Sequence, residues 1–228
     1  MSEATHSTVA ASAETGQADA ILKKIAILAF CSIALGFAIQ GLILAAKLAA
    51  ANEIVWAKAV VDMTGGITWA LLVCTGVGIG TSIMKARPLL AGVIALICAP
   101  IAIAFAKSSQ KVMSGLMGAA EQEAVLSLGT ISVLRAIEYG VLGWLLGRLA
   151  QAGVERSWPY VRVGMGIGVV FGGAIAALTY QVAVTQGLQP GGVQIASSII
   201  NEVIFPIGCA FVIYVGQLVG RTAGVLAK

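Results

Sequence analysis

PIAIAF at Pro100–Phe105 and PIGCAF at Pro206–Phe211 are near copies of each other. Four of the six positions match, and two of these hold proline and phenylalanine, which the chain uses only five and six times. Each copy lies in a long apolar run that we interpret as the third membrane helix of a three-helix half. A three-span unit repeated in tandem inserts upside down the second time, and many transporters and channels are built on this plan.

The similarity extends beyond the proline motif. Three residues of the first half recur in the second at a constant offset of 102, which pairs Trp56, Val61 and Met63 with Trp158, Val163 and Met165. The proline motif recurs at an offset of 106, and the turn sequence Gln189–Gly192 accounts for the four extra residues. We therefore predict an inverted 3+3 repeat, with chance similarity among apolar residues as the alternative.

The composition indicates an integral membrane protein. Of 228 residues, 59% are hydrophobic and 11% are charged, whereas a soluble domain carries about 25% charged residues. The mean hydropathy is +0.97. The apolar runs lack the alternation of barrel strands, so we expect an all-α fold. The net charge of +4 comes from basic residues at helix ends. It is a topology signal and predicts no nucleic-acid partner.

Six apolar runs reach the roughly 20 residues that a helix needs to cross a bilayer. The expected spans are Ile25–Ala46, Met63–Met84, Pro88–Ala106, Ala124–Gly147, Val163–Thr185 and about Ala196–Val219. This divides the chain into a disordered polar tail (1–22), a first half (23–106), a linker (107–123), a second half (124–220) and a short tail (221–228). The linker is either a short amphipathic helix on the membrane surface or a plain connector.

Loop charges predict the orientation. With the N-terminus inside, nine basic residues fall in inner segments and four in outer ones. Because basic residues are enriched in cytoplasmic loops, both termini are expected in the cytoplasm. We expect the compartment to be a bacterial-type cytoplasmic (inner) membrane, with the linker outside it.

One arginine, Arg135, lies near the middle of the fourth expected span. Placing Arg at that depth costs about 2.5–3.5 kcal/mol on insertion scales, so it must pair or face water. Glu138 lies on the same helix face and Glu202 at a similar depth in the sixth span, and the sequence leaves open which one pairs with it. With Gln40 and Asn201 they form the predicted solute, ion or proton site. The alternative is a buried ion pair that only fixes the helix register.

Prolines and glycines mark a second group of candidates. Pro100 and Pro206 are predicted to kink their helices and to free carbonyl groups, either as hinges or as mere kinks. Small residues at helical spacing predict close helix packing between the second and fifth spans, with a pore lining as the alternative. The glycines concerned are Gly76, Gly80, Gly164, Gly168 and Gly172. Asp62 is expected at the outer edge of its span, in contact with water.

Several chemistries lack their usual residues. The only histidine is His6, no Walker A sequence occurs, and the four cysteines lie in apolar runs without CxxC spacing. We therefore expect no enzyme, no catalytic residue, no metal and no cofactor. The favoured function is a channel or transporter for a small polar solute or ion. The alternative is a non-catalytic subunit or scaffold of a larger complex. Besides the lipid bilayer, the partner would be a second copy of the chain or a membrane subunit.

Overall fold

The computed structural model describes residues 3–50, 54–83, 87–119 and 125–222. Ten helical segments occur in these residues. They are α1 (Glu3–Ala49), α2 (Trp56–Ile83), α3 (Pro88–Met117), α4 (Leu128–Gln151), α5 (Ser157–Ile167), η1 (Gly168–Gly172), α6 (Gly173–Thr185), α7 (Gly192–Ile199), η2 (Ile200–Ile204) and α8 (Phe205–Thr222). The segments η1 and η2 are π-helical turns inside otherwise α-helical rods. The predicted all-helical fold is confirmed.

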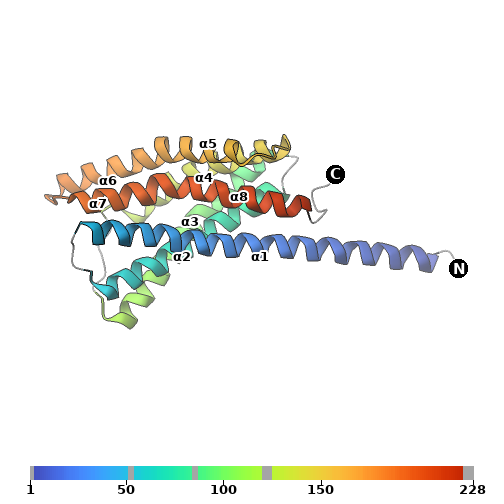
Figure 1. Cartoon of the computed structure of the whole chain (residues 1–228), viewed down its shortest axis with the longest axis horizontal. Coiled ribbons are helices and arrows are strands. Elements are labelled where there is room, and N and C mark those ends of the chain that lie inside the picture. The colour runs from blue at the N-terminus through green and yellow to red at the C-terminus, as the bar shows by residue number, and fades with distance from the viewer. Residues whose placement is uncertain (1–2, 51–53, 84–86, 120–124, 223–228) are drawn as a thin grey trace.

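The segments form six long rods, because α5–η1–α6 and α7–η2–α8 are each continuous (Figure 1). Five of the rods are long and apolar enough to cross a membrane. The remaining rod, α4, carries Arg135 and Glu138 near its centre and Arg148 in its last turn. The architecture is thus that of a multi-pass helical membrane protein.

The start of α1 and the end of α8 lie at one end of the bundle, on the right in Figure 1. We call this the terminal end. The opposite end, where α1 ends and α2 begins, is called the cavity end. The N-terminal part of α1 projects from the terminal end well beyond the other helices.

Two segment boundaries differ from the predicted ones. The structure begins α1 at Glu3, where a disordered tail was expected. This segment is rich in alanine, the strongest helix former, which an argument from polarity alone neglects. The expected linker continues α3 as helix to Met117, and Gly118 then ends it with a left-handed backbone (φ 61°). The remainder of that linker at 120–123, and residues 223–228 of the C-terminal tail, lie outside the described residues.

The helix α3 packs through small residues. Ala91, Ala95, Ala99 and Ala102 are fully buried along one face, which lies between α2 and α4. Small side chains let helix backbones approach closely in a membrane, where dispersion contacts drive association. On α2, Gly76 faces Cys98 and Gly80 faces the main chain of Ala91. These two glycines therefore pack against α3.

Gly164, Gly168 and Gly172, which we call the second glycine stripe, pack in a corresponding way within the second half. Gly76 and Gly80 of α2 are the first stripe. A Cβ atom at Gly164 would meet Pro206, and one at Gly168 would overlap the carbonyl of Val203. Gly172 lies in the same manner against the carbonyl of Glu202. Both stripes thus pack on the third rod of their own half. The expectation that the second and fifth spans use them to pack on each other is not met.

Candidate functional site: a polar cavity over a buried arginine

The side chain of Arg135 lies between two carboxylates. Its Nη1 donates to Glu138 Oε2 at 3.1 Å, one helical turn further along α4. Its Nη2 forms an ion pair with Glu202 Oε2 at 2.6 Å, across the bundle in η2. Arg135 is 5% exposed and Glu138 is fully buried. The structure therefore answers the open question of pairing, because the guanidinium engages both glutamates.

The partner Glu202 is presented by the π-helical turn η2. Its neighbour Asn201 donates from Nδ2 to Glu202 Oε1 at 3.2 Å, so each carboxylate oxygen faces a polar group. The main chain of η2 packs directly on the glycines Gly168 and Gly172 of η1. A π-turn adds a residue to the helical turn and redirects the side chains there, and such turns often occur at functional sites. Here the redirected side chains are the polar ones.

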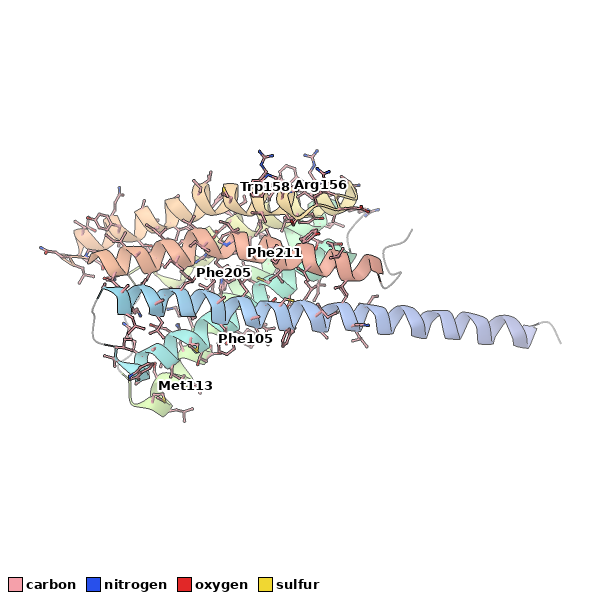
Figure 2. All side chains as sticks on the ribbon, viewed as in Figure 1. Phe105, Met113, Arg156, Trp158, Phe205 and Phe211 are labelled. Atoms are coloured by element: carbon pink, nitrogen blue, oxygen red, sulfur yellow. The ribbon has the colours of Figure 1, made fainter. Side chains whose placement is uncertain are left out.

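Two aromatic rings face the guanidinium, and a third ring packs against both of them. Its Cζ lies 5.2 Å from the centre of the Trp69 ring and 5.9 Å from that of Tyr139. The Trp69 and Tyr139 rings meet edge to face at 5.3 Å, and Phe205 packs against both at 6.1 and 6.3 Å. Phe205, which is labelled in Figure 2, is 1% exposed and therefore faces the interior. Cation–π contacts of a desolvated charge contribute about 2 kcal/mol, so the rings help to keep Arg135 ionised in an apolar layer.

A polar cavity of about 760 Å³ extends inward from the cavity end and reaches this cluster. Arg135, Asn201 and Glu202 line its inner part, and Gln40 contributes to its wall from α1. The Gln40 side chain lies over Gly66, where a Cβ atom would collide with it. The site residues predicted from the sequence thus surround one cavity, with Glu138 buried behind Arg135.

Nearer the cavity end the wall carries additional charge. Lys47, Lys58 and Lys107 line the cavity together with Asp62. Lys47 Nζ lies 3.6 Å from Asp62 Oδ2, and both side chains are about one third exposed. Asp62 therefore contacts solvent, as expected, but it is also part of the cavity wall. The lining holds four cationic and two anionic side chains.

The opposite side of the cluster is closed. Towards the terminal end the interior is filled by fully buried apolar residues such as Val73, Val77, Leu142 and Leu146. Two buried polar atoms next to the cluster, Glu138 Oε1 and the Tyr139 hydroxyl, have no hydrogen-bond partner within the described part of the chain. Unsatisfied groups of this kind are costly and often mark functional positions. Because apolar residues fill the terminal side, the cavity is accessible from the cavity end of the bundle.

The two predicted hinge residues occupy different settings. Pro100 lies inside the continuous α-helix α3, whereas Pro206 is the second residue of α8, two positions after the end of η2. The carbonyls of Glu202 and Val203, just before Pro206, face the glycine stripe. These two carbonyls consequently pack against the main chain of η1.

Sequence reasoning missed the aromatic enclosure and the lysines. Trp69 lies in the middle of its span, away from the interfacial belts that tryptophan favours in membrane proteins, and this position was an available signal. The contribution of Lys47, Lys58 and Lys107 to one cavity had no such signal, because it depends on the relative placement of three helices. Among the described residues, no group of three His, Cys, Asp or Glu side chains is arranged to hold a metal ion.

Comparison of the chain with protein-family models, with curated proteins and with solved structures gave no match. The geometry of the cavity and of the cluster therefore carries the functional argument.

Proposed function

We propose that the chain is a transporter or channel for a small polar solute or ion, and that the Arg135–Glu202 pair is its binding element. The observation that carries the proposal is the polar cavity of about 760 Å³ that ends at this pair. Ionised residues inside a membrane bundle are expensive and commonly mark substrate or ion pathways. A purely structural ion pair has no need of a solvent-accessible approach.

The proposal includes alternating access between two three-helix halves. An inverted 3+3 arrangement is supported by the packing of α3 on α4, which corresponds to that of α8 on α1 when the halves are exchanged. The two copies of the proline motif agree in part in their burial. Phe105 and Phe211 are exposed, while Ile103 and Cys209 are buried. Solute would enter at the cavity end, and rocking of the halves would open the closed terminal side.

The membrane and its orientation belong to the same proposal. We place the chain in a bacterial-type cytoplasmic membrane with both termini in the cytoplasm, so the cavity end faces outward. The excess of basic residues in the segments at the terminal end supports this orientation. No enzymatic step is part of the mechanism.

Reconstitution tests the proposal. Proteoliposomes carrying the full chain are exposed to gradients of a panel of polar solutes and salts, and shrinkage and reswelling are followed by light scattering. Glu202→Gln keeps the side-chain shape and leaves Arg135 paired with Glu138, so it should fold and lose at least tenfold of the solute flux. Arg135→Lys keeps the charge but loses the planar group that meets both glutamates, so it should also lower the flux. Arg148→Lys is its matched control, because Arg148 is exposed on the same helix.

Absence of flux for every solute with correctly inserted protein would contradict the proposal. It would favour the alternative, a non-catalytic subunit or scaffold whose ion pair is structural. In that case, substitutions in the glycine stripe would release a bound subunit or a second copy of the chain, which size-exclusion chromatography detects.

A further inference from the structure

A second cavity adjoins the polar one. It has a volume of about 880 Å³ and lies between the C-terminal part of α3 and the segments η1, α6 and α7. Six residues line both spaces, namely Asp62, Lys107, Gln110, Ile131, Gln194 and Ser198. The two cavities therefore meet along a common wall, and each has a volume typical of a ligand site.

The two spaces differ in chemistry. The second cavity is bounded mainly by aliphatic side chains and glycine, among them Val169, Ala176, Ile195 and Ile199. The first carries three lysines and the buried cluster, and the second has Lys107 and Lys111 among its lining residues. Together they form an apolar compartment beside a cationic one.

Two of the cations lack a compensating carboxylate. Lys47 is paired with Asp62, and Arg135 is paired with both glutamates. Within the described residues Lys58 and Lys107 have no ion-pair partner, and Lys107 lies on the wall that the two cavities share. A cationic group beside an apolar space is complementary to an anion that carries an alkyl chain.

We propose that the joined cavities bind a single-chain anionic amphiphile, such as a long-chain carboxylate. The carboxylate lies in the polar cavity near Lys107 and Lys58, and the alkyl chain occupies the apolar cavity along α6 and α7. A small anion would leave the apolar space empty, and an uncharged chain would leave both lysines without a counter-charge. The inference narrows the solute class of the proposed transport site. It rests on the proposed function for movement of the ligand, but not for its binding.

A direct measurement of binding separates the contributions of the ligand's carboxylate head and of its alkyl chain. The full-length protein is placed in nanodiscs of zwitterionic phosphatidylcholine, and uptake of radiolabelled dodecanoate is measured against discs without protein. We expect saturable binding of about one dodecanoate per chain, because such pockets are few per protein. Acetate, which has only the head, and dodecanol, which has only the chain, should each bind at least tenfold more weakly.

Matched variants locate the site. Lys107→Gln removes the shared cation and Ala176→Trp fills the apolar cavity, so each should weaken dodecanoate binding at least tenfold. Arg156→Gln and Val184→Trp make the same chemical changes at exposed positions that do not line either space, and they should bind as the parent protein does. Figure 2 places Arg156 at the terminal end, and Arg156 lines neither cavity.

Three results would overturn the inference. Acetate binding as tightly as dodecanoate would show that the apolar cavity plays no part and that the ligand is a small anion. Dodecanol binding equally well would show that the charge is irrelevant. Uptake equal to that of empty discs, or unchanged by both cavity variants, would assign dodecanoate to the surrounding bilayer.

Failure of this inference can be distinguished from failure of the proposed function. Binding without flux supports this inference and rejects transport. Flux of a small solute without dodecanoate binding does the opposite.

Discussion

The two proline-bearing rods carry the same six-residue motif and differ in backbone form. In α3, Pro100 lies within an unbroken α-helix whose buried alanines form a flat packing surface. In α7–η2–α8, Pro206 lies two positions after a run of five π-helical residues, and these present Asn201 and Glu202. The deviation from α-helix thus coincides with the polar chemistry, which suggests that one rod supports the bundle while its counterpart holds the site.

The largest effect is expected at the cluster that η2 helps to form. Arg135→Met leaves two buried carboxylates without their cation, and removing one partner of a buried ion pair costs about 3–5 kcal/mol. Thermal unfolding in detergent should show this loss, whereas Arg148→Met, exposed on the same helix, should change stability little. Neutralising Glu138 and Glu202 to glutamine in the Arg135→Met background should restore most of the loss. Unchanged stability of the single variant would show that the cluster is not buried as described.

The contact between η1 and η2 provides a sharper test, because two adjacent glycines differ in their surroundings. A Cβ atom at Gly172 would overlap the carbonyl oxygen of Glu202, whereas one at Gly173 would meet open space. Gly172→Ala should therefore destabilise the protein by about 1–3 kcal/mol through overpacking. Gly173→Ala should be neutral or stabilising by up to about 1 kcal/mol, as in other helices. Equal unfolding temperatures for the two variants would contradict the close packing of the π-turns.

Replacing each proline by alanine tests whether the two rods differ in role. Alanine supplies an N–H that can form one more main-chain hydrogen bond, worth about 0.5–1.5 kcal/mol. Pro100→Ala should stabilise α3 by about this amount and leave flux unchanged. Pro206→Ala should gain less, because rewinding η2 to α-helix would turn Glu202 away from Arg135, and flux should fall. Identical behaviour of the two variants, in unfolding and in flux assays, would remove the distinction.

The smallest effect is expected at the mouth of the cavity. The Lys47–Asp62 pair is separated by 3.6 Å and is about one third exposed on each side. Exposed pairs contribute about 0–1 kcal/mol, and salt screens them. Lys47→Gln should lower the unfolding temperature slightly at low ionic strength and not at all at high ionic strength. A large loss that persists in salt would mean that this pair is as buried as the central cluster.

Much of the architecture was accessible from the sequence, because apolar length and composition are sufficient to predict membrane-crossing helices. Arg135, Glu138 and Glu202 were accessible for the same reason, since ionised residues stand out against an apolar background. The features that could not be predicted from the sequence are local ones. Nothing in the residues around Gly168–Gly172 or Ile200–Ile204 distinguishes a π-turn from an α-turn, because the turn depends on the contact between the two rods.

The partner of Arg135 and the position of the lysines were equally out of reach. Which carboxylate meets a guanidinium depends on rotation of α4 about its axis, and helix periodicity does not fix that rotation relative to η2. The sequence left open whether the segment after Ala106 is a short helix or a connector, and it did not show that α3 continues unbroken to Met117. The inverted repeat stays a prediction.

The position of Trp69 also provides an optical probe that needs no label. Trp69 is 8% exposed and lies over the charge of Arg135, whereas Trp56, Trp144 and Trp158 are 37–67% exposed. Because Trp69 also lines the polar cavity, iodide that enters from the cavity end should quench its emission. A solute bound at the guanidinium should protect this part of the fluorescence, in the unmodified protein.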